Sequence, residues 1–369
     1  MNNIYVTRPE LPPLEALLPS LEEIWSSRVL TNGGAFHERL ESALASHLGV
    51  PHLSLCTNAT IGLMLALRAL GLRGEVITTP FTFVATAHAI EWAGLTPVFA
   101  DIDSVTLNLD PAAVERAITP DTCAILPVHC YGHACDVVAL EAVAHSHGLK
   151  LVYDAAHAFG AMLRGRSLAG WGDLSVLSFH ATKVFNTFEG GAIVSRDAET
   201  KLKIDRLKNF GIVDETHVEG IGLNGKMNEF CAALGLAQLD RVDAAIAQRA
   251  RIDARYRQGL DGLTGLAPLD PAPEEGPNHA YFPVRVLPEY GESRDALQAR
   301  LKAHGIQARR YFCPLVSDLA DYRDRASAAP QHLTVARQAA DQVLCLPLYP
   351  DLDEVDQTRI IDLLRHGTH

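Results

Sequence analysis

Short apolar runs alternate with amphipathic stretches from about residue 50 to residue 195. This alternation is typical of a mainly parallel sheet covered by helices. We predict strands at residues 52–56, 75–79, 97–100, 123–128, 150–153, 174–179 and 191–195. The loop between the last two strands is too short for a crossover helix, so we expect these two strands to be antiparallel neighbours.

Helical spacing connects these strands and dominates the chain after them. Two examples are TIGLMLALRAL and DVVALEAVAHSHG, and Gly148 ends the second. A long helical pattern runs from Met227 to about residue 262, and helices of that length commonly link domains. The proline-rich segment LAPLDPAPEEGPNH that follows is predicted to be a surface loop.

The rest of the chain predicts a smaller α+β unit, built from YFPVRVL, ALQARLKAHG, IQARRYF and VDQTRIIDLLRHG. A chain of 369 residues is also too long for one ordinary core. We therefore expect residues 1–245 to form an N-terminal arm and a large domain, and residues 246–369 to form a small C-terminal domain.

Composition and charge narrow the class of protein. With 48% hydrophobic and 21% charged residues, the chain is typical of globular proteins, which excludes disordered and fibrous classes. The net charge is −12 and the basic residues are scattered, so we expect no nucleic-acid partner. We find no secretory signal and no membrane-length apolar run, and the seven cysteines suit reduced thiols, so we expect a soluble cytoplasmic protein with no membrane partner.

Polar residues follow the predicted strands at their carboxyl ends, where open α/β sheets bind ligands. They are Thr57 to Thr60, Pro80 to Phe83, His129 to Gly132, Asp154 with His157, and Ser178 with Lys183. If the strands are parallel, these groups share one rim of the sheet.

Each of these residues also has an ordinary structural interpretation. A threonine or asparagine before a helix is most often an N-cap, although a helix start also binds phosphate. Asp154 could form a structural salt bridge, and His157 could be a hydrogen-bonded histidine in the core. Phe83 alone suggests core packing, and Lys183 alone suggests a surface lysine.

The cluster of His129, Cys130, His133 and Cys135 suggests zinc, an interpretation that we reject. Adjacent residues at a strand end point to opposite faces and would not share one ion, and no second Cys/His pair has zinc-ribbon spacing. We expect no metal. Dinucleotide-binding and nucleotide-binding glycine loops are also absent from the sequence.

Taken together, the rim residues suit one cofactor. A helix start for phosphate, a carboxylate at a strand end, an aromatic face and a lysine match an aromatic, phosphorylated cofactor with a basic nitrogen and an aldehyde. Pyridoxal 5′-phosphate (PLP) has each of these features.

The sequence resembles the DegT/DnrJ/EryC1/StrS family of nucleotide-sugar aminotransferases over nearly its whole length. The matching motifs are LTNGGAFHERLESALASHLGV, TNATIGLMLALRALG, TPFTFVATAHAI, ILPVHCYGHACD, YDAAHAFGA, SFHATKVFNTFEGGAIVS, GLNGKMNEFCAALGLAQLDR, RRYFCPL and VLCLPLYPDL. The resemblance implies the fold-type I of PLP-dependent transferases: a mainly parallel seven-stranded sheet with helices on both faces, plus a smaller C-terminal α+β domain. The large domain would bind PLP.

The family pattern implies three catalytic roles. Lys183 would form the internal aldimine with the cofactor aldehyde. Asp154 would face the pyridine nitrogen and keep it protonated, and His157, where many relatives have glutamine, would hydrogen-bond the phenolic oxygen.

The same pattern implies the remaining cofactor contacts. Phe83 would stack on the ring, and Ala59, Thr60 and Ser178 would hold the phosphate. Asn224 would reach the phosphate in the neighbouring subunit, which makes a homodimer with shared active sites the smallest competent unit.

The resemblance implies a reaction in two halves. L-Glutamate would give its amino group to the cofactor, leaving 2-oxoglutarate and pyridoxamine 5′-phosphate, and the amino group would then pass to a keto carbon of a nucleotide-linked sugar. The versions HATKVFNTFEGG and NGKMNEF resemble the subgroup acting on dTDP-linked 6-deoxy keto sugars. We favour the 4-keto position, and the 3-keto position is the alternative.

The chain departs from the family at one substrate contact. Many relatives have Asn-Tyr-Arg-Met where this chain has Asn224, Gly225, Lys226 and Met227, so Lys226 is expected to alter that contact. The triplet Arg309, Arg310 and Tyr311 offers further candidate substrate contacts, although arginines beside a strand are as often solvated.

Three other functions compete with amino transfer. A PLP-dependent sugar dehydratase of the same family typically has histidine at the aldimine position, so Lys183 argues against it. A non-catalytic PLP-binding sensor is opposed by the complete catalytic set and by the lack of a visible DNA-binding segment. A binding protein for another phosphate ligand predicts no covalent chromophore.

Overall fold

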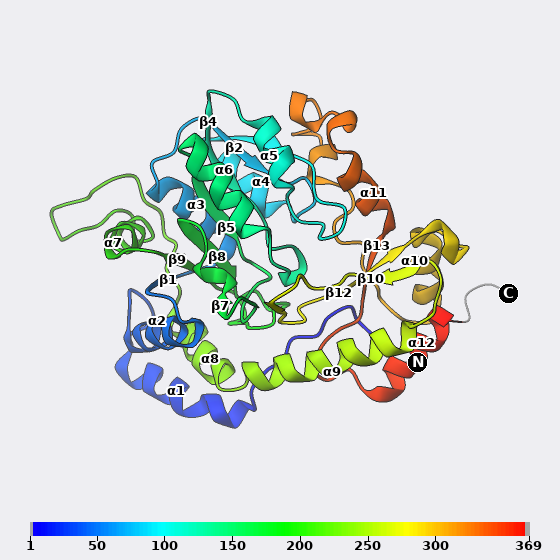
Figure 1. The fold of residues 1–369 in the computed structure, drawn as a ribbon. Coiled ribbons are helices and arrows are strands. Elements are labelled where there is room, and N and C mark those ends of the chain that lie inside the picture. Colours follow the sequence, from blue (N-terminus) through cyan, green and yellow to red (C-terminus); the bar gives the residue numbers. More distant parts are fainter. Residues whose placement is uncertain (1–2, 366–369) are drawn as a thin grey trace.

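A seven-stranded sheet forms the centre of the larger part of the protein in the computed structural model, which describes residues 3–365 (Figure 1). Its strands are β1 (His52–Cys56), β2 (Glu75–Thr78), β3 (Thr96–Phe99), β4 (Thr122–Leu126), β5 (Lys150–Asp154), β8 (Leu174–Ser178) and β9 (Gly191–Ser195). The spatial order is β1-β9-β8-β5-β4-β2-β3. All seven predicted strands are confirmed. The predicted antiparallel pairing of β8 with β9 is also confirmed, and β9 is antiparallel to β1 as well.

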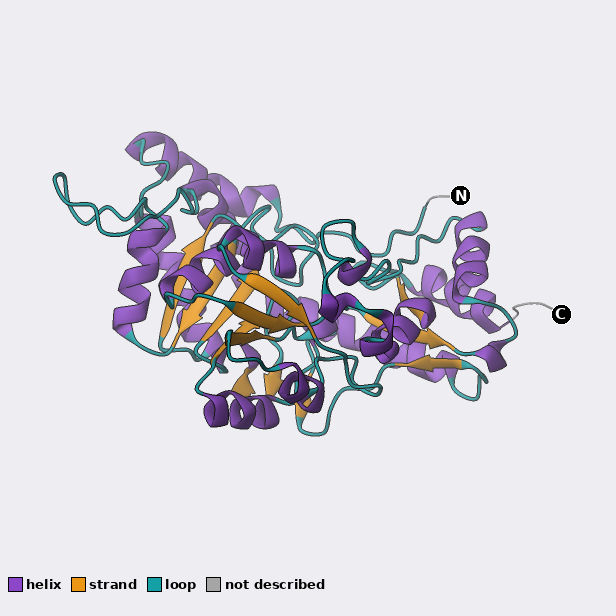
Figure 2. Ribbon diagram, turned by 90° about the horizontal axis from the view of Figure 1, so that it is seen from above, coloured by secondary structure: helices purple, strands orange, loops and turns teal. Residues whose placement is uncertain are grey.

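Helices cover both faces of this sheet (Figure 2). They are α1 (Leu14–Ser27), α2 (Ala35–Leu48), α3 (Ala59–Ala69), α4 (Ala85–Trp92), α5 (Pro111–Ala117), α6 (Val137–His147), α7 (Ala198–Leu207) and α8 (Glu229–Leu239). Alternate residues of β5 belong to different cores: Leu151 and Tyr153 pack with α2, α5, α6 and α8, whereas Val152 packs with α3, α4 and α7. The predicted fold class, a mainly parallel sheet with helices on both faces, is therefore confirmed.

Local signals explain where the helices begin and end. The Asp136 side chain accepts a hydrogen bond from the amide of Ala139 at the start of α6. Gly148 ends α6 with φ of 65°, a left-handed conformation that glycine adopts at little cost. Both signals are readable in the sequence, and the predicted stop at Gly148 is confirmed.

A smaller unit lies beside the large sheet and contains its own antiparallel sheet. Its elements are α9 (Val242–Leu260), β10 (Leu266–Pro268), β12 (Phe282–Val286), α10 (Arg294–Ala303), α11 (Thr334–Gln342), β13 (Val343–Leu346) and α12 (Glu354–Arg365). The strand order is β10-β12-β13, and Ile4 of the N-terminal arm packs in the core of this unit. The division of the chain at residue 245 stays a prediction. The last two residues of the segment VDQTRIIDLLRHG, 366 and 367, lie outside the described range.

Two predictions in the connecting region are wrong. The single long helix predicted from Met227 is two helices, α8 and α9, separated at Asp240 and Arg241. The chain changes direction between them, because α8 packs in the large core and α9 extends toward α12 (Figure 1). The periodic pattern shows which positions are apolar but does not reveal this change of direction.

The proline-rich segment is not entirely loop. It contains β10 and the short strand β11 (Glu275–Gly276), which pairs with β6 (Met162–Leu163); β6 in turn pairs with β7 (Arg166–Ser167). These strands depend on pairing between distant segments, which local propensity does not reveal. No helix within residues 3–365 is both long and apolar enough to cross a membrane.

One buried carboxylate joins two helices of the large part. The side chain of Glu229, at the start of α8, accepts hydrogen bonds from the amides of Phe36 at 2.8 Å and His37 at 3.0 Å. It therefore caps α2, whose own N-cap, Gly34, has no side chain. A Cβ at Gly34 would lie only 2.6 Å from the Glu229 carboxyl group, so this approach requires glycine.

Replacing Glu229 with alanine is expected to lower the free energy of unfolding by about 3 kcal/mol, because two buried amides lose their acceptor. Urea denaturation measures this change. The matched control is Glu199→Ala, at an exposed position in the first turn of α7, with an expected loss under about 0.5 kcal/mol. Equal losses for the two variants would contradict the capping role.

Candidate active site

Lys183 lies in the loop between β8 and β9 and is half-buried. Its Nζ donates a hydrogen bond to Oη of Tyr281 at 3.3 Å. Burial lowers the pKa of Lys183 to about 8, although the nearby charge of Asp154 opposes this shift. An appreciable fraction of the amine is therefore neutral near pH 7, as a nucleophile or base must be. Lys183 is not an ordinary surface lysine.

Asp154 is the last residue of β5 and is buried. Its Oδ2 accepts a hydrogen bond from Oγ1 of Thr86 at 2.8 Å, and its Oδ1 accepts one from the amide of Ala156 at 3.1 Å. Burial nevertheless raises the pKa of this carboxyl group. Within residues 3–365 Asp154 forms no ion pair, so the structural salt bridge considered from the sequence is not present there. The site holds a buried carboxylate that a cationic ligand would neutralise.

His157 is buried three residues after Asp154. Its Nδ1 accepts a hydrogen bond from the amide of Tyr131 at 3.2 Å, so Nε2 carries the ring proton. Burial lowers the pKa of His157 well below its usual value, and Lys183 adds to this effect. The ring lies parallel to Phe312, with the centroids 6.0 Å apart. His157 is therefore a neutral imidazole with Nε2 as its hydrogen-bond donor.

The start of α3 and the end of β8 lie close together. Ser178 is paired across the sheet with Gly191, and Gly191 is paired in turn with Cys56, three residues before α3. A Cβ at Gly191 would lie 2.9 Å from the amide nitrogen of Ala59, so glycine lets the helix start approach the sheet. The first amides of a helix, here those of Ala59 and Thr60, lack intrahelical partners and attract anions.

Other residues around this helix start have local roles. Asn58 caps α3, because its Oδ1 accepts a hydrogen bond from the amide of Ile61 at 2.9 Å. Phe83 is 60% exposed, whereas Phe81 is fully buried. The core interpretation of Phe83 is therefore wrong, and its ring is free to stack on a flat ligand.

Asn224 and Lys226 occupy the segment between α7 and α8, which projects from the large part in both views (Figures 1 and 2). The Asn224 side chain is exposed, and Nζ of Lys226 donates a hydrogen bond to Oδ1 of Asn209 at 2.6 Å. The carbonyl of Gly225 accepts a hydrogen bond from the amide of Thr57, which places this segment beside the start of α3. Within residues 3–365, neither side chain hydrogen-bonds to the catalytic candidates.

The triplet Arg309, Arg310 and Tyr311 divides between two environments. The guanidinium of Arg309 lies 5.1 Å from the centre of the Tyr311 ring, and the Tyr311 ring meets that of Tyr281 edge-on at 5.5 Å. Arg309 and Tyr311 therefore lie near Tyr281, the residue that contacts Lys183. Arg310 instead pairs with Asp295 at 3.2 Å on the surface.

The cluster of His129, Cys130, His133 and Cys135, for which we rejected a zinc site, has other contacts. Nδ1 of His129 accepts a hydrogen bond from the amide of Cys135 at 3.1 Å, and its ring stacks on Tyr153 at 4.6 Å. In the described part of the chain, no group of three or more His, Cys, Asp or Glu side chains is placed to hold a metal ion.

Several residues that surround the candidates received no role from the sequence, although Tyr131 lies in the predicted rim segment His129 to Gly132. They are Thr86, which donates to Asp154; Tyr131, whose amide holds His157; Phe312, which stacks on His157; and Tyr281, which contacts Lys183. Thr86 lies inside a recognised motif, but Tyr281 follows Lys183 by 98 residues, and no local pattern connects the two.

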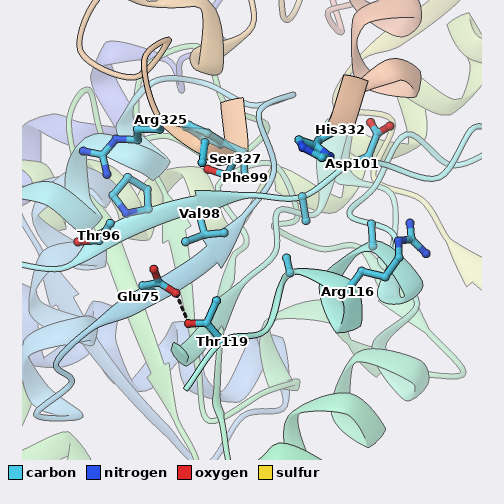
Figure 3. Close-up of a pocket in the computed structure, with 15 residues that line it drawn as sticks. Glu75, Thr96, Val98, Phe99, Asp101, Arg116, Thr119, Arg325, Ser327 and His332 are labelled. Carbon is cyan, nitrogen blue, oxygen red and sulfur yellow. Dashed lines mark hydrogen bonds between the residues drawn. The ribbon is translucent and has the colours of Figure 1, made fainter. Parts of the chain in front are cut away.

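A separate cavity of about 530 Å³ lies at the β3 edge of the sheet (Figure 3). Glu75, Val98, Arg116, Arg325 and His332 are among its lining residues, and Glu75 accepts a hydrogen bond from Thr119. None of the predicted site residues lines it. The residues around Lys183, and not this cavity, form the candidate active site.

Comparisons with known proteins show the family of this chain. The sequence profile of the DegT/DnrJ/EryC1/StrS aminotransferase family matches residues 15–365. A dTDP-4-amino-4,6-dideoxy-D-glucose transaminase of Shigella dysenteriae is 49% identical over 362 residues, covering 98% of each chain. A protein of the same name from Escherichia coli is 48% identical over 364 residues, again covering 98% of each chain.

Solved structures show the same relationship. The crystal structure of DesI in the presence of its TDP-sugar product has a TM-score of 0.94 and 41% sequence identity to this chain, and the match covers 99% of this chain and 93% of DesI. The resemblance found in the sequence is therefore confirmed over almost the whole protein. The chain belongs to the DegT/DnrJ/EryC1/StrS aminotransferase family.

Proposed function

We propose that this aminotransferase uses PLP to move the amino group of L-glutamate to the keto carbon of a dTDP-linked 4-keto-6-deoxy sugar. The products are 2-oxoglutarate and a dTDP-4-amino-4,6-dideoxy sugar. Two relatives at 49% and 48% identity bear the name of a dTDP-4-amino-4,6-dideoxy-D-glucose transaminase, which supports the 4-keto position over the 3-keto alternative. The observation that carries amino transfer is the half-buried Lys183, with its lowered pKa, near a buried Asp154 that lacks an ion-pair partner within residues 3–365.

The residues present fit PLP. The uncompensated carboxylate of Asp154 suits a protonated pyridine nitrogen, and the neutral His157 offers Nε2 to a phenolic oxygen. The exposed ring of Phe83 suits a stacking partner. We propose that the amides of Ala59 and Thr60 hold the phosphate, with the hydroxyl of Ser178 beside them.

When bound, the cofactor supplies an aldehyde that carries the amino group and a ring that withdraws electrons. The neutral amine of Lys183 would be the nucleophile that binds this aldehyde. Once freed, Nζ of Lys183 would carry the proton from the α-carbon of glutamate to the cofactor carbon that receives the amino group. In the second half-reaction it would carry a proton from that carbon to the sugar carbon that is aminated. Asp154 would stabilise a positive charge on the ring nitrogen, and His157 would orient the ring through Nε2.

We also propose a homodimer with shared active sites. Several apolar side chains of the projecting segment are exposed: Phe210, Ile212, Val213, Val218 and Ile221. Exposed apolar clusters mark contact surfaces, so a second copy of the chain is the proposed cover. Asn224 and Lys226 lie at the base of this segment and would serve the neighbouring site. In the same chain, Arg309 and Tyr311 would contact the sugar nucleotide or glutamate.

The visible absorption spectrum of the PLP-loaded protein tests this function, with L-glutamate added alone. We expect a band from the covalently held cofactor, which glutamate bleaches while one equivalent of 2-oxoglutarate is released per site. Addition of a dTDP-4-keto-6-deoxy sugar should then restore the band. No band would contradict PLP binding, and a band that glutamate leaves unchanged would contradict the donor and favour the sugar dehydratase or the sensor.

A further inference from the structure

Lys183 and Tyr281 connect the two parts of the protein. Within residues 3–365, Oη of Tyr281, at 3.3 Å, is the only hydrogen-bond partner of Nζ of Lys183. Tyr281 immediately precedes β12, so it comes from the smaller unit. Nη1 of the buried Arg249 donates to the carbonyl of Ala280 at 3.4 Å and holds the main chain just before Tyr281.

Aromatic rings on several sides restrict the side chain of Tyr281. Its ring meets that of His157 at 4.9 Å, that of Tyr131 at 5.7 Å and that of Tyr311 at 5.5 Å, each edge-on. Edge-to-face aromatic pairs are attractive and depend on orientation. Because these rings belong to different segments of the chain, they fix the direction in which the Tyr281 hydroxyl points.

The Tyr281 hydroxyl is a neutral partner for the lysine. Burial raises the pKa of Tyr281, with further increases from the Cys345 and Cys130 thiols that outweigh the opposing effect of Arg249 and Arg309. The phenol therefore stays protonated at neutral pH. The charge near Lys183 comes from Asp154, whereas His157 is uncharged. Tyr281 thus contributes a hydrogen bond to the amine without adding a counter-ion.

We propose that Tyr281 is the positioning residue of Lys183: its hydroxyl accepts a hydrogen bond from the free amine and holds Nζ at the place from which it transfers protons. The inference rests on the proposed function, in which the freed amine moves a proton from glutamate. The contact itself breaks no bond and transfers no proton, because the amine donates to Oη throughout. Without it, the flexible lysine side chain would occupy several rotamers after release.

The variant Tyr281→Phe tests this role, because it removes Oη and keeps the ring and its edge contacts. In the apoprotein, the pH dependence of Lys183 acetylation, followed on its peptide by mass spectrometry, reports the pKa of the amine. An acceptor stabilises the charged amine, so its loss should lower the pKa of Lys183, about 8 in the native protein, by about one pH unit. In the loaded protein, the single-turnover rate with glutamate should fall about tenfold with little change in KM.

Tyr131→Phe is the matched control. It removes the hydroxyl that donates to the carbonyl of Tyr311 in the same aromatic cluster, without touching Lys183. We expect it to leave the pKa of Lys183 unchanged. If Tyr281→Phe unfolds at the wild-type temperature and also leaves that pKa unchanged, the inference is overturned. Failure of the wild-type protein to release 2-oxoglutarate from glutamate would instead overturn the proposed function.

Discussion

Replacing Lys183 with alanine is expected to abolish amino transfer, with a loss of at least about 10³-fold, because the proposed nucleophile and the proposed base are the same side chain. The fold should remain, since the side chain contributes one hydrogen bond of 3.3 Å to the structure. Steady-state rates with glutamate and the keto sugar measure the loss. The matched control is Lys203→Ala, at an exposed position on α7, which should keep wild-type rates. Near-normal activity of the Lys183 variant would remove this residue from the mechanism.

The same variant tests the shared active site. Mixed dimers of Lys183→Ala and Asn224→Ala chains should contain one intact site, built from Lys183 of one chain and Asn224 of the other. Random pairing makes half of the dimers mixed, so about a quarter of wild-type activity should return on mixing. No recovery after subunit exchange would contradict a contribution of Asn224 to the neighbouring site.

Asp154→Asn is expected to lower the first half-reaction with glutamate by about 10²–10³-fold, because the site loses the charge that stabilises a protonated ring nitrogen. The cofactor should also dissociate more readily. Stopped-flow spectra of the loaded variant measure the first effect, and PLP titration of the apoprotein measures the second. Asp154→Glu, which keeps the charge but shifts its position, should lose less.

The stability of the Asp154 variant distinguishes a functional charge from a structural one. Burial raises the pKa of Asp154, so folding disfavours its ionised form, and the group costs stability at pH values above its unfolded pKa. Removing the charge at neutral pH should therefore leave the melting temperature of the apoprotein equal or higher while activity falls. A clear drop in melting temperature would show that Asp154 mainly stabilises the fold.

The periodic signals of the chain were sufficient for the large sheet. Strands such as β5 and β8 are short, mainly apolar runs, and helix α6 carries its own start at Asp136 and its own stop at Gly148. These features depend on neighbouring residues only, so they are visible in the sequence. The break between α8 and α9 and the pairing of β6 with β11 depend on contacts with distant segments. The predicted single helix and the predicted loop were therefore wrong.

The candidate site divides in the same way. The order of the strands and the polar residues after them led from the sequence alone to Lys183, Asp154 and His157, because parallel strands bring their carboxyl ends to one edge of the sheet. Their roles remain proposals, supported by the geometry and by the family.

What the tertiary structure decided is the chemical state of these groups. Burial lowers the pKa of Lys183 to about 8, the amide of Tyr131 sets the tautomer of His157, and Tyr281 reaches the lysine from the smaller unit. The protein's sequence by itself determined the fold class and the family, because these follow from local pattern and motif order, and the same pattern led to the candidate residues of the site. Protonation and orientation depend on desolvation and on contacts between segments far apart in the chain, and these exist only once the chain has folded.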